Sequence, residues 1–299
     1  MSAQADKAGG TPAPPGTPEG PEPARESVPP SELRDLVPEP SGVGALGARA
    51  IELGREALEL YSVFVRTLFY CVRGRREKGA TLQQMYEIGN RSIFFLTVVM
   101  GFIGMILVFQ AGLQTKRVIP ELSLLGANYL ELLIRDLAAS IGALMLATRV
   151  GAGIAAEIGS MVVTEQIDAL RMCAADPIDY LIKPRFLASI VMTTVLGVWS
   201  AGVAIATGLL TAYVMFDLRP ATFMNFSLVT AGDVTLGLTK CVAYGAAIPV
   251  VSGHSGLSTY GGSEGVGWAT TRAVGNSALA VIVLDMLISG AGFFIFPKG

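Results

Sequence analysis

Charged residues are scarce in this sequence: they make up 15% of its 299 positions, whereas hydrophobic residues make up 52%. Soluble proteins average about 25% charged residues. Lysine and arginine together number 22 against 24 aspartates and glutamates, so the net charge is −2 and there is no basic excess to bind nucleic acid. The composition is that of a membrane protein and gives no support to a nucleic-acid partner.

Cysteine and histidine are also rare. The three cysteines, Cys71, Cys173 and Cys241, are scattered along the chain, and His254 is the only histidine. So few and so dispersed ligands predict neither a disulfide framework nor a zinc site. The phosphate-binding pattern Gly-x-x-x-x-Gly-Lys-Ser/Thr is absent as well. We therefore expect no metal or cofactor in this chain and no ATP hydrolysis by that type of loop.

Proline is concentrated at one end, because ten of the sixteen prolines fall within residues 1–40. Such a segment has too few large apolar side chains to offset the chain entropy lost on folding. It also lacks the basic stretch and apolar core of a secretory signal. Residues 1–42 are predicted to form a disordered cytoplasmic tail.

Residues 43–78 show helical spacing, with an apolar stripe that includes Leu53, Leu60 and Phe64. This stretch is too charged to cross a bilayer, and it ends in the basic cluster Arg73, Arg75, Arg76 and Lys78. A basic amphipathic helix is suited to the surface of an anionic membrane. We predict an interfacial helix here, and the alternative of a helix packed on a soluble partner stays open.

Residues 79–299 are predicted to form the transmembrane domain. A helix rising ~1.5 Å per residue needs about 20 apolar residues to cross a ~30 Å hydrocarbon layer. The expected spans are about 92–113, 131–153, 187–214, 232–252 and 274–296. The second is the weakest, because its charge-free stretch between Asp136 and Arg149 has only twelve residues. Its alanines and glycines are nevertheless typical of membrane helices that face protein.

Positive charge orients these spans. With the N-terminus inside, thirteen lysines and arginines fall in cytoplasmic segments and six outside. Cytoplasmic loops of membrane proteins carry the excess of these residues. The fold class expected is therefore an all-α integral membrane protein, with its N-terminus cytoplasmic and its C-terminus periplasmic.

The segment between the second and third spans carries acidic residues at intervals. Glu157, Glu165 and Asp168 alternate there with apolar side chains, which predicts a short amphipathic helix exposed to the cytosol. A plain connecting loop with a solvated charged face is the alternative.

These residues also carry a family resemblance. The motifs are Arg149-Val-Gly, Ala155-Ala-Glu-Ile-Gly159 and Val163-Thr-Glu-Gln-Ile-Asp-Ala-Leu170, followed near the C-terminus by Gly265-Val-Gly-Trp-Ala-Thr-Thr-Arg-Ala-Val274. Over roughly residues 86–296 the chain resembles the MlaE/YrbE permeases, the membrane subunits of Mla- and Mce-type ABC lipid transporters in bacteria.

The resemblance implies a function and a set of partners. It implies a permease in the bacterial inner membrane that moves phospholipid or a related lipid. The implied partners are a second permease copy, identical or paralogous, a periplasmic MCE-domain protein and a cytoplasmic ABC ATPase that binds ATP and Mg. A coupling helix at about 157–170 would contact that ATPase. Its candidate residues are Glu157, Ile158, Met161, Glu165, Ile167 and Asp168.

The same resemblance suggests a lipid-binding role for Arg135, Asp136 and Lys240, with the two cations available to an anionic headgroup. The family carries an Arg-Glu-Leu-Gly-Pro-like run where this chain reads Arg135-Asp-Leu-Ala-Ala139, so the helix geometry there is expected to differ. Two alternatives stay open: Arg135 and Asp136 snorkel to the outer interface, and Lys240 pairs with Asp285 or Asp233.

Two functions from other classes are alternatives to lipid transport. Gly253-His-Ser-Gly256 is similar to the motif of intramembrane serine proteases, but Ser255 has only the adjacent His254 as a base. A stand-alone secondary transporter would show internal repeats, and none is visible.

Small residues such as Gly202 and Gly245 favour close helix packing over a polar pore. The Gly-rich run 253–267 is expected to be a flexible loop.

Overall fold

The computed structural model describes residues 42–73, 78–118 and 124–295. The predicted disordered tail lies outside these ranges, apart from Gly42. The chain divides into two units, residues 1–53 and 54–299. In the first unit the described residues are the beginning of α2. In the second unit the described residues form helices joined by short turns, without a strand, which confirms the predicted all-helical class.

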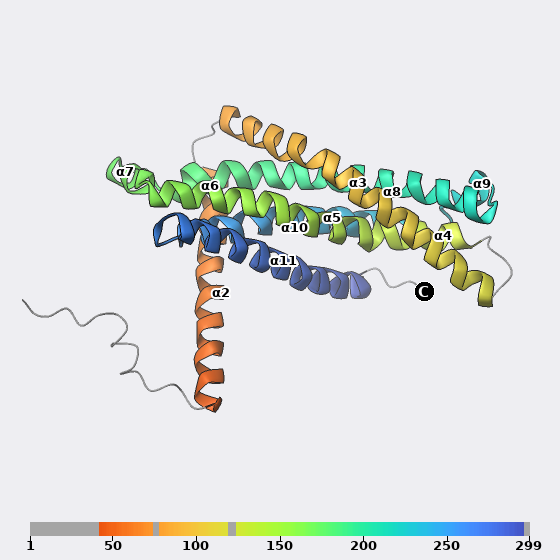
Figure 1. Cartoon of the computed structure of the whole chain (residues 1–299), viewed down its shortest axis with the longest axis horizontal. Coiled ribbons are helices and arrows are strands. Elements are labelled where there is room, and N and C mark those ends of the chain that lie inside the picture. The colour runs from red at the N-terminus through yellow and green to blue at the C-terminus, as the bar shows by residue number, and fades with distance from the viewer. Residues whose placement is uncertain (1–41, 74–77, 119–123, 296–299) are drawn as a thin grey trace, which may run out of the picture. The chain divides into compact units, whose positions relative to one another are not determined.

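The helices follow one another along the chain with few long connections (Figure 1). Their bounds are α2 Gly42–Arg73, α3 Lys78–Val118, α4 Leu125–Leu132, α5 Ala138–Leu146, α6 Ala152–Val163, α7 Gln166–Met172, α8 Lys183–Phe216, α9 Pro220–Phe223, α10 Ala231–Leu257 and α11 Gly262–Ile295. Three π-helical turns, η1 Leu133–Leu137, η2 Ala147–Gly151 and η3 Ile178–Ile182, join neighbouring helices of this series.

Five continuous helical stretches within the described residues are long and apolar enough to cross a membrane. They are Gly79–Lys116, Leu125–Val163, Ile178–Phe216, Ala231–Leu257 and Gly262–Ile295. Their number agrees with the sequence prediction, and the second, predicted from the weakest signal, is a 39-residue stretch. Each stretch is longer than the span predicted for it, because the helix continues past the apolar segment that the prediction used.

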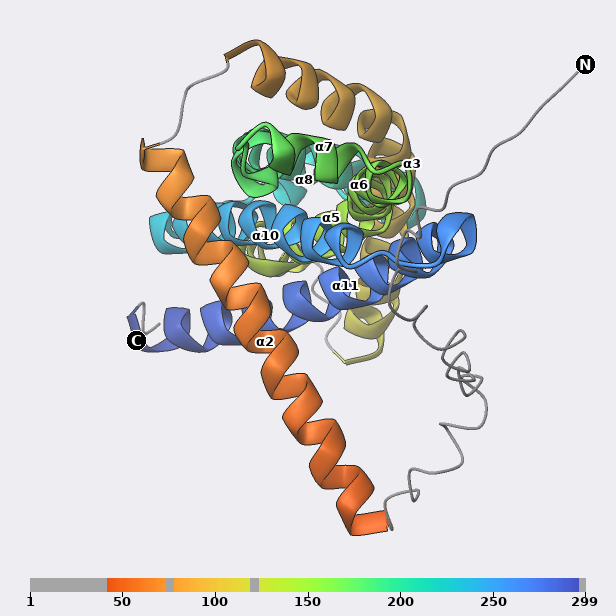
Figure 2. The ribbon, with the colours of Figure 1, turned by 90° about the vertical axis from the view of Figure 1, so that its left-hand side faces the viewer.

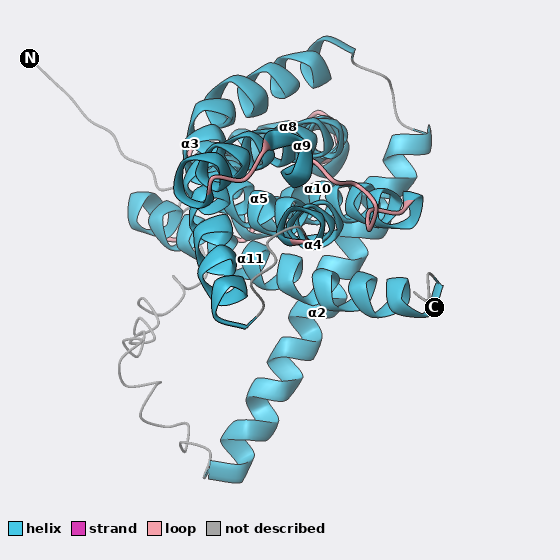
Figure 3. Cartoon of the chain, turned by 90° about the vertical axis from the view of Figure 1, so that its right-hand side faces the viewer, coloured by secondary structure: helices cyan, strands magenta, loops and turns pink. Residues whose placement is uncertain are grey.

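The long helices α3, α8, α10 and α11 run along the second unit, with α7 at one end and α4 and α9 at the other (Figure 1). Figure 2 faces the α7 end and Figure 3 the opposite end. A large hydrophobic core joins α3, α5, α8 and α10, and a smaller one near the α7 end joins α6, η3 and α8. The α7 end therefore has a core of its own.

Glycines let several helices approach to backbone contact. A Cβ added to Gly104 of α3 would lie 2.6 Å from the carbonyl oxygen of Ala204 on α8. One added to Gly245 of α10 would lie 2.8 Å from the Cα of Ile190 on α8, as expected for a packing glycine. The same expectation is wrong for Gly202, which faces open space.

Candidate functional site

The segment predicted as one coupling helix is an elbow between two helices. Helix α6 ends at Val163 and α7 begins at Gln166. Between them Glu165 adopts a left-handed backbone with a φ of 60°. Left-handed conformations are unfavourable for residues with a Cβ, and no glycine or proline marks this break in the sequence. The prediction of a continuous helix over 157–170 was wrong at this point.

The C-terminal end of α7 is also formed by a non-glycine residue with a left-handed backbone. The amide of Ala175 donates to the carbonyl of Leu170 at 3.1 Å, and the amide of Ala174 donates to that of Arg171 at 3.0 Å. This pattern is a Schellman motif, in which glycine usually occupies the left-handed position. Here Ala174 occupies it, with a φ of 57°. The seven residues of α7 are thus bounded on both sides by non-glycine residues in strained conformations.

The predicted coupling residues fall into two groups. Glu165 and Asp168 are exposed on the elbow and α7, and Asp168 accepts a hydrogen bond from Arg171 at 3.3 Å. Ile158 and Ile167 are instead buried in the core at the α7 end, and Met161 is partly buried against it. The acidic side chains are therefore accessible, whereas the apolar ones pack within this chain.

A buried arginine to which the sequence analysis gives no role ties α6, the first helix of the elbow, to the start of α8. The guanidinium of Arg185 lies 2.6 Å from the carboxylate of Glu157 and donates to the carbonyl of Leu181 at 2.8 Å. The Arg185 side chain is 4% exposed and the Glu157 side chain 44% exposed. Burying an arginine at the start of an apolar helix is costly unless it is paired. The position of Arg185 at the start of the apolar helix α8 was the signal in the sequence that this side chain needs a partner.

Residues of the first family motif pack against the end of α10 and the turn after it. A Cβ on Gly256 of α10 would lie 2.9 Å from the Cβ of Ile158 on α6. One on Gly159 would lie 2.8 Å from the hydroxyl of Thr259. Helix α10 continues to Leu257 and α11 starts at Gly262, so the predicted flexible loop over 253–267 was wrong except at the turn 258–261. Gly253, Gly256 and Gly265 serve close packing, whereas Gly261 and Gly262 form the turn with positive φ.

The part of α2 that belongs to the second unit is attached to the same end. Tyr70 donates a hydrogen bond to Asp176 at 2.8 Å, and Arg272 of α11 donates to Glu56 at 2.7 Å. The hydrogen bond to the Asp176 carboxylate raises the pKa of Tyr70 above its usual value. Val63 is buried in the smaller core together with residues of α6 and η3. Polar and apolar contacts both tie α2 to the helices around the elbow.

The predicted lipid-binding residues lie together where η1 packs against the first half of α10. The ammonium of Lys240 is fully buried and contacts the carboxylates of Asp136 and Asp285, the latter at 2.7 Å. Asp285 also accepts hydrogen bonds from Ser140 at 2.9 Å and Tyr244 at 2.6 Å. Lys240 is thus paired with Asp285, one of the two partners that the sequence left open, and it links α10 to α11 and η1.

Arg135 has its own partner. It donates to Asp233 at 3.1 Å, and the Asp233 carboxylate also accepts from Thr230 at the start of α10. Arg135 and Asp136 lie in the π-helical turn η1, where this sequence departs from the family run. Helix α10 approaches this turn closely, since a Cβ on Gly237 would lie 2.4 Å from the carbonyl oxygen of Ile134. Both cations of the predicted lipid site are therefore neutralised by carboxylates of the same chain.

The hydroxyl of Ser255 is not arranged as a nucleophile. It is buried and donates to the carbonyl of Val251 at 3.0 Å, one turn earlier on α10. The ring of His254 lies 3.7 Å from the carboxylate of Glu59. The geometry gives no serine–histidine pair of the kind that activates a protease.

Comparisons with known proteins agree with the resemblance. A family model described as Permease MlaE matches residues 81–291. A probable ABC transporter permease of Synechocystis is 35% identical over 226 residues, which is 75% of this chain and 86% of the relative. One from Rickettsia bellii is 32% identical over 248 residues, 82% of this chain and 95% of the relative.

A plant relative has a more specific name. The Arabidopsis thaliana protein called Trigalactosyldiacylglycerol 1, chloroplastic, is 32% identical over 224 residues, 74% of this chain and 64% of the relative. The family match covers more than half of the chain, and five helices are long and apolar enough to span a membrane. The chain belongs to the MlaE permease family and is a multi-pass membrane subunit of the ABC transporter type.

Proposed function

We propose that this chain is the permease of an ABC-type lipid transporter in the bacterial inner membrane. It moves phospholipid or a related lipid between that membrane and a periplasmic MCE-domain partner. A separate cytoplasmic ATPase, which binds ATP and Mg, supplies the energy. Family membership supports the transport role, and the plant relative, whose printed name contains that of a galactose-bearing diacylglycerol, supports a lipid cargo.

The elbow between α6 and α7 is the observation that carries the coupling to an ATPase. It presents Glu165 and Asp168 outward, while Arg185 and the smaller core fix it to the long helices. A rigidly attached, acidic surface element is suited to receive movement from a partner with basic groups. In the proposed orientation the N-terminus and α7 are cytoplasmic, and the permease works as a pair of copies.

Two further parts of the proposal concern the location of α2 and the residues that contact the transported headgroup. Helix α2 lies at the membrane surface, because Leu58, Leu68 and Phe69 are exposed although apolar and charged side chains lie beside them. The transported headgroup contacts Arg135 and Asp136, whose side chains are 24% and 36% exposed. The covered Lys240 acts beneath them as a counter-ion.

The test of coupling is charge reversal on the elbow. Glu165→Lys with Asp168→Lys should release the ATPase when the complex is purified in mild detergent, because acidic contacts become repulsive. Asp217→Lys is the matched control: Asp217 is exposed, acidic and also left-handed, with a φ of 53°, but it follows α8 at the opposite end. Its complex should remain intact.

Retention of the ATPase by the double variant would contradict the coupling assignment. The transport assignment is tested separately in vesicles that contain the permease, with or without its ATPase and ATP. Movement of lipid against its gradient should require both. Uphill movement by the permease alone would instead indicate a secondary transporter.

A further inference from the structure

A small polar pocket opens at the turn between α10 and α11. Its volume is about 350 Å³, at the lower end of the ~300–1,000 Å³ range of small-molecule sites. Tyr260 of the turn lines it, together with Glu264, Trp268 and Arg272 of α11. The turn lies at the α7 end of the long helices (Figure 1). None of these four residues belongs to the coupling surface or to the lipid contacts proposed above.

Backbone contacts on two sides fix the shape of the pocket. A Cβ on Gly265 would lie 1.6 Å from the carbonyl oxygen of Tyr260, so the first turn of α11 packs directly against the preceding residues. On the other side, a Cβ on Gly159 of α6 would lie 2.8 Å from the hydroxyl of the buried Thr259. Gly159 precedes the end of α6 at Val163 by four residues, about 6 Å at ~1.5 Å per residue. The pocket wall is therefore attached to α6 about one helical turn before the elbow.

The charges that line the pocket favour a cation as its occupant. The guanidinium of Arg272 is neutralised by the carboxylate of Glu56, at 2.7 Å. Glu264 is exposed and has no ion-pair partner within the described residues. An acidic residue in the first turn of a helix is stabilised by the helix dipole. The dipole accounts for the carboxylate at this position but not for the exposed aromatic rings beside it.

Two aromatic side chains complete the pocket. Tyr260 is 85% exposed and Trp268 is 72% exposed. Glu264 and Trp268 are four residues apart on α11, so their side chains are neighbours on one face of the helix. Exposed tyrosine and tryptophan also occur at membrane–water interfaces, but that location does not require an unpaired carboxylate. A carboxylate beside aromatic rings suits a guanidinium, which stacks on ring faces and pairs with acidic groups.

We propose that this α10–α11 pocket binds an arginine side chain of the cytoplasmic ATPase, with the guanidinium against Trp268 and the carboxylate of Glu264. The proposal rests on the function proposed above, in which the same partner contacts the elbow. The acidic residues Glu165 and Asp168 are exposed on the elbow, and the pocket wall adjoins α6 just before it. One basic partner surface is complementary to both places. The ATPase then contacts the permease at two points, the elbow and the α10–α11 turn.

Photo-cross-linking tests the position of this contact. Benzoylphenylalanine replaces Trp268 in the full-length permease, which is assembled with the ATPase that co-purifies with the parent. Cross-linked peptides are mapped by mass spectrometry, and the partner is identified as an ATPase by its Gly-x-x-x-x-Gly-Lys-Ser/Thr loop. Position 268 should link to it. The same replacement at Tyr213, which is 56% exposed near the opposite end of α8, should not. Links from position 268 to lipid or within the permease alone would overturn the proposal.

Substitutions test the chemistry of the contact. The ATPase is titrated onto the permease in lipid nanodiscs, and the Kd is measured. Glu264→Gln and Trp268→Leu should each raise the Kd roughly tenfold, because a cation loses its carboxylate or its ring. Trp268→Phe keeps a ring and should bind nearly like the parent. Asp217→Asn removes an exposed carboxylate at the opposite end and is the matched control. Glu264→Arg should be rescued when the cross-linked arginine of the ATPase is changed to glutamate.

The elbow variant separates this proposal from the coupling assignment. If Glu165→Lys with Asp168→Lys releases the ATPase while Glu264→Gln and Trp268→Leu bind like the parent, the pocket contact is refuted and the coupling assignment stands. Weaker binding in the pocket variants alone would support the pocket and contradict the elbow. A parent permease that binds no ATPase would contradict both. Both pocket side chains are exposed, so thermal unfolding of their variants should match the parent and exclude a loss of fold.

Discussion

Two buried cations on the long helices differ in the number of carboxylates that they contact. Arg185 pairs with one carboxylate, Glu157, and with a backbone carbonyl near the α7 end. Lys240 is shared by Asp136 and Asp285, so that three charged groups from η1, α10 and α11 meet. The first arrangement fixes one surface element, whereas the second ties the long helices together. The difference predicts that losing Lys240 damages the fold and that losing Arg185 chiefly damages coupling.

Lys240→Met is expected to have the largest effect. It leaves two partly buried carboxylates without their cation, and breaking a buried pair costs about 3–5 kcal/mol. Thermal unfolding in detergent should show this loss. The triple variant with Asp136→Asn and Asp285→Asn should recover much of it, because no unpaired charge is left. A single variant as stable as the parent would show that the cluster is hydrated rather than buried.

Arg185→Met should cost less stability, about 1.5–3 kcal/mol, because the freed Glu157 carboxylate is 44% exposed and water can solvate it. Its effect on coupling should be larger. The elbow loses its anchor, so lipid-stimulated ATP hydrolysis by the assembled transporter should fall several-fold while the ATPase stays bound. Normal stimulation would show that the smaller core alone positions α7.

Ala174→Gly tests strain at the end of α7. Glycine adopts a positive φ without the penalty that alanine has there, so stability should rise by up to about 1 kcal/mol. The same substitution inside α7, Ala169→Gly, should lower stability by up to about 1 kcal/mol, because glycine is a poor helix former. Two changes of equal size and opposite sign would be measured by thermal unfolding. A loss of stability at both positions would argue against a left-handed Ala174.

The first and third spans could be predicted because each contains a long charge-free run, which a sequence displays directly. The other three could be predicted because few charged residues interrupt their apolar runs. The break at Glu165 could not, because non-glycine residues occupy the left-handed positions and no turn signal marks them. In the charged cluster, the cost of burial indicated that Lys240 needs a partner. Choosing among Asp136, Asp233 and Asp285 required the packing of α10 against η1 and α11.

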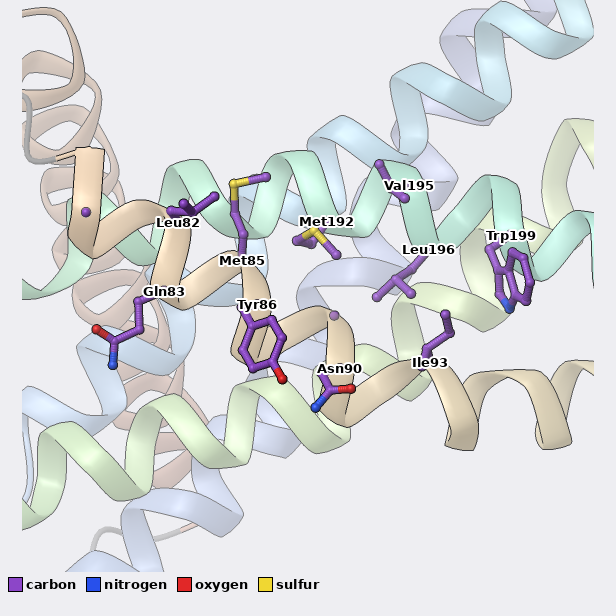
Figure 4. Close-up of a pocket in the computed structure, with 12 residues that line it drawn as sticks. Leu82, Gln83, Met85, Tyr86, Asn90, Ile93, Met192, Val195, Leu196 and Trp199 are labelled. Atoms are coloured by element: carbon purple, nitrogen blue, oxygen red, sulfur yellow. The ribbon is translucent and has the colours of Figure 1, made fainter.

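The apolar groove between the first part of α3 and α8 (Figure 4) also could not be predicted from the sequence. Met85 and Met192 are ordinary apolar residues of two spans, and nothing in their spacing reveals a cavity. It arises from the angle between α3 and α8, which depends on where glycines such as Gly104 allow contact. Sequence patterns define each helix well, whereas crossing angles depend on all the contacts of a pair.

Tyr70→Phe should have the smallest effect and sharpens the comparison at the α7 end. It removes one partly exposed hydrogen bond to Asp176, which is worth about 0.5–1 kcal/mol. Folding raises the pKa of Tyr70, so its contribution is present below the unfolded pKa of about 10 and is lost as the pH rises through the higher folded value. Unfolding curves of parent and variant should therefore differ at pH 8 and converge above pH 10. A difference that persists in strong alkali would mean that Tyr70 stabilises α2 by packing of its ring rather than through its hydroxyl.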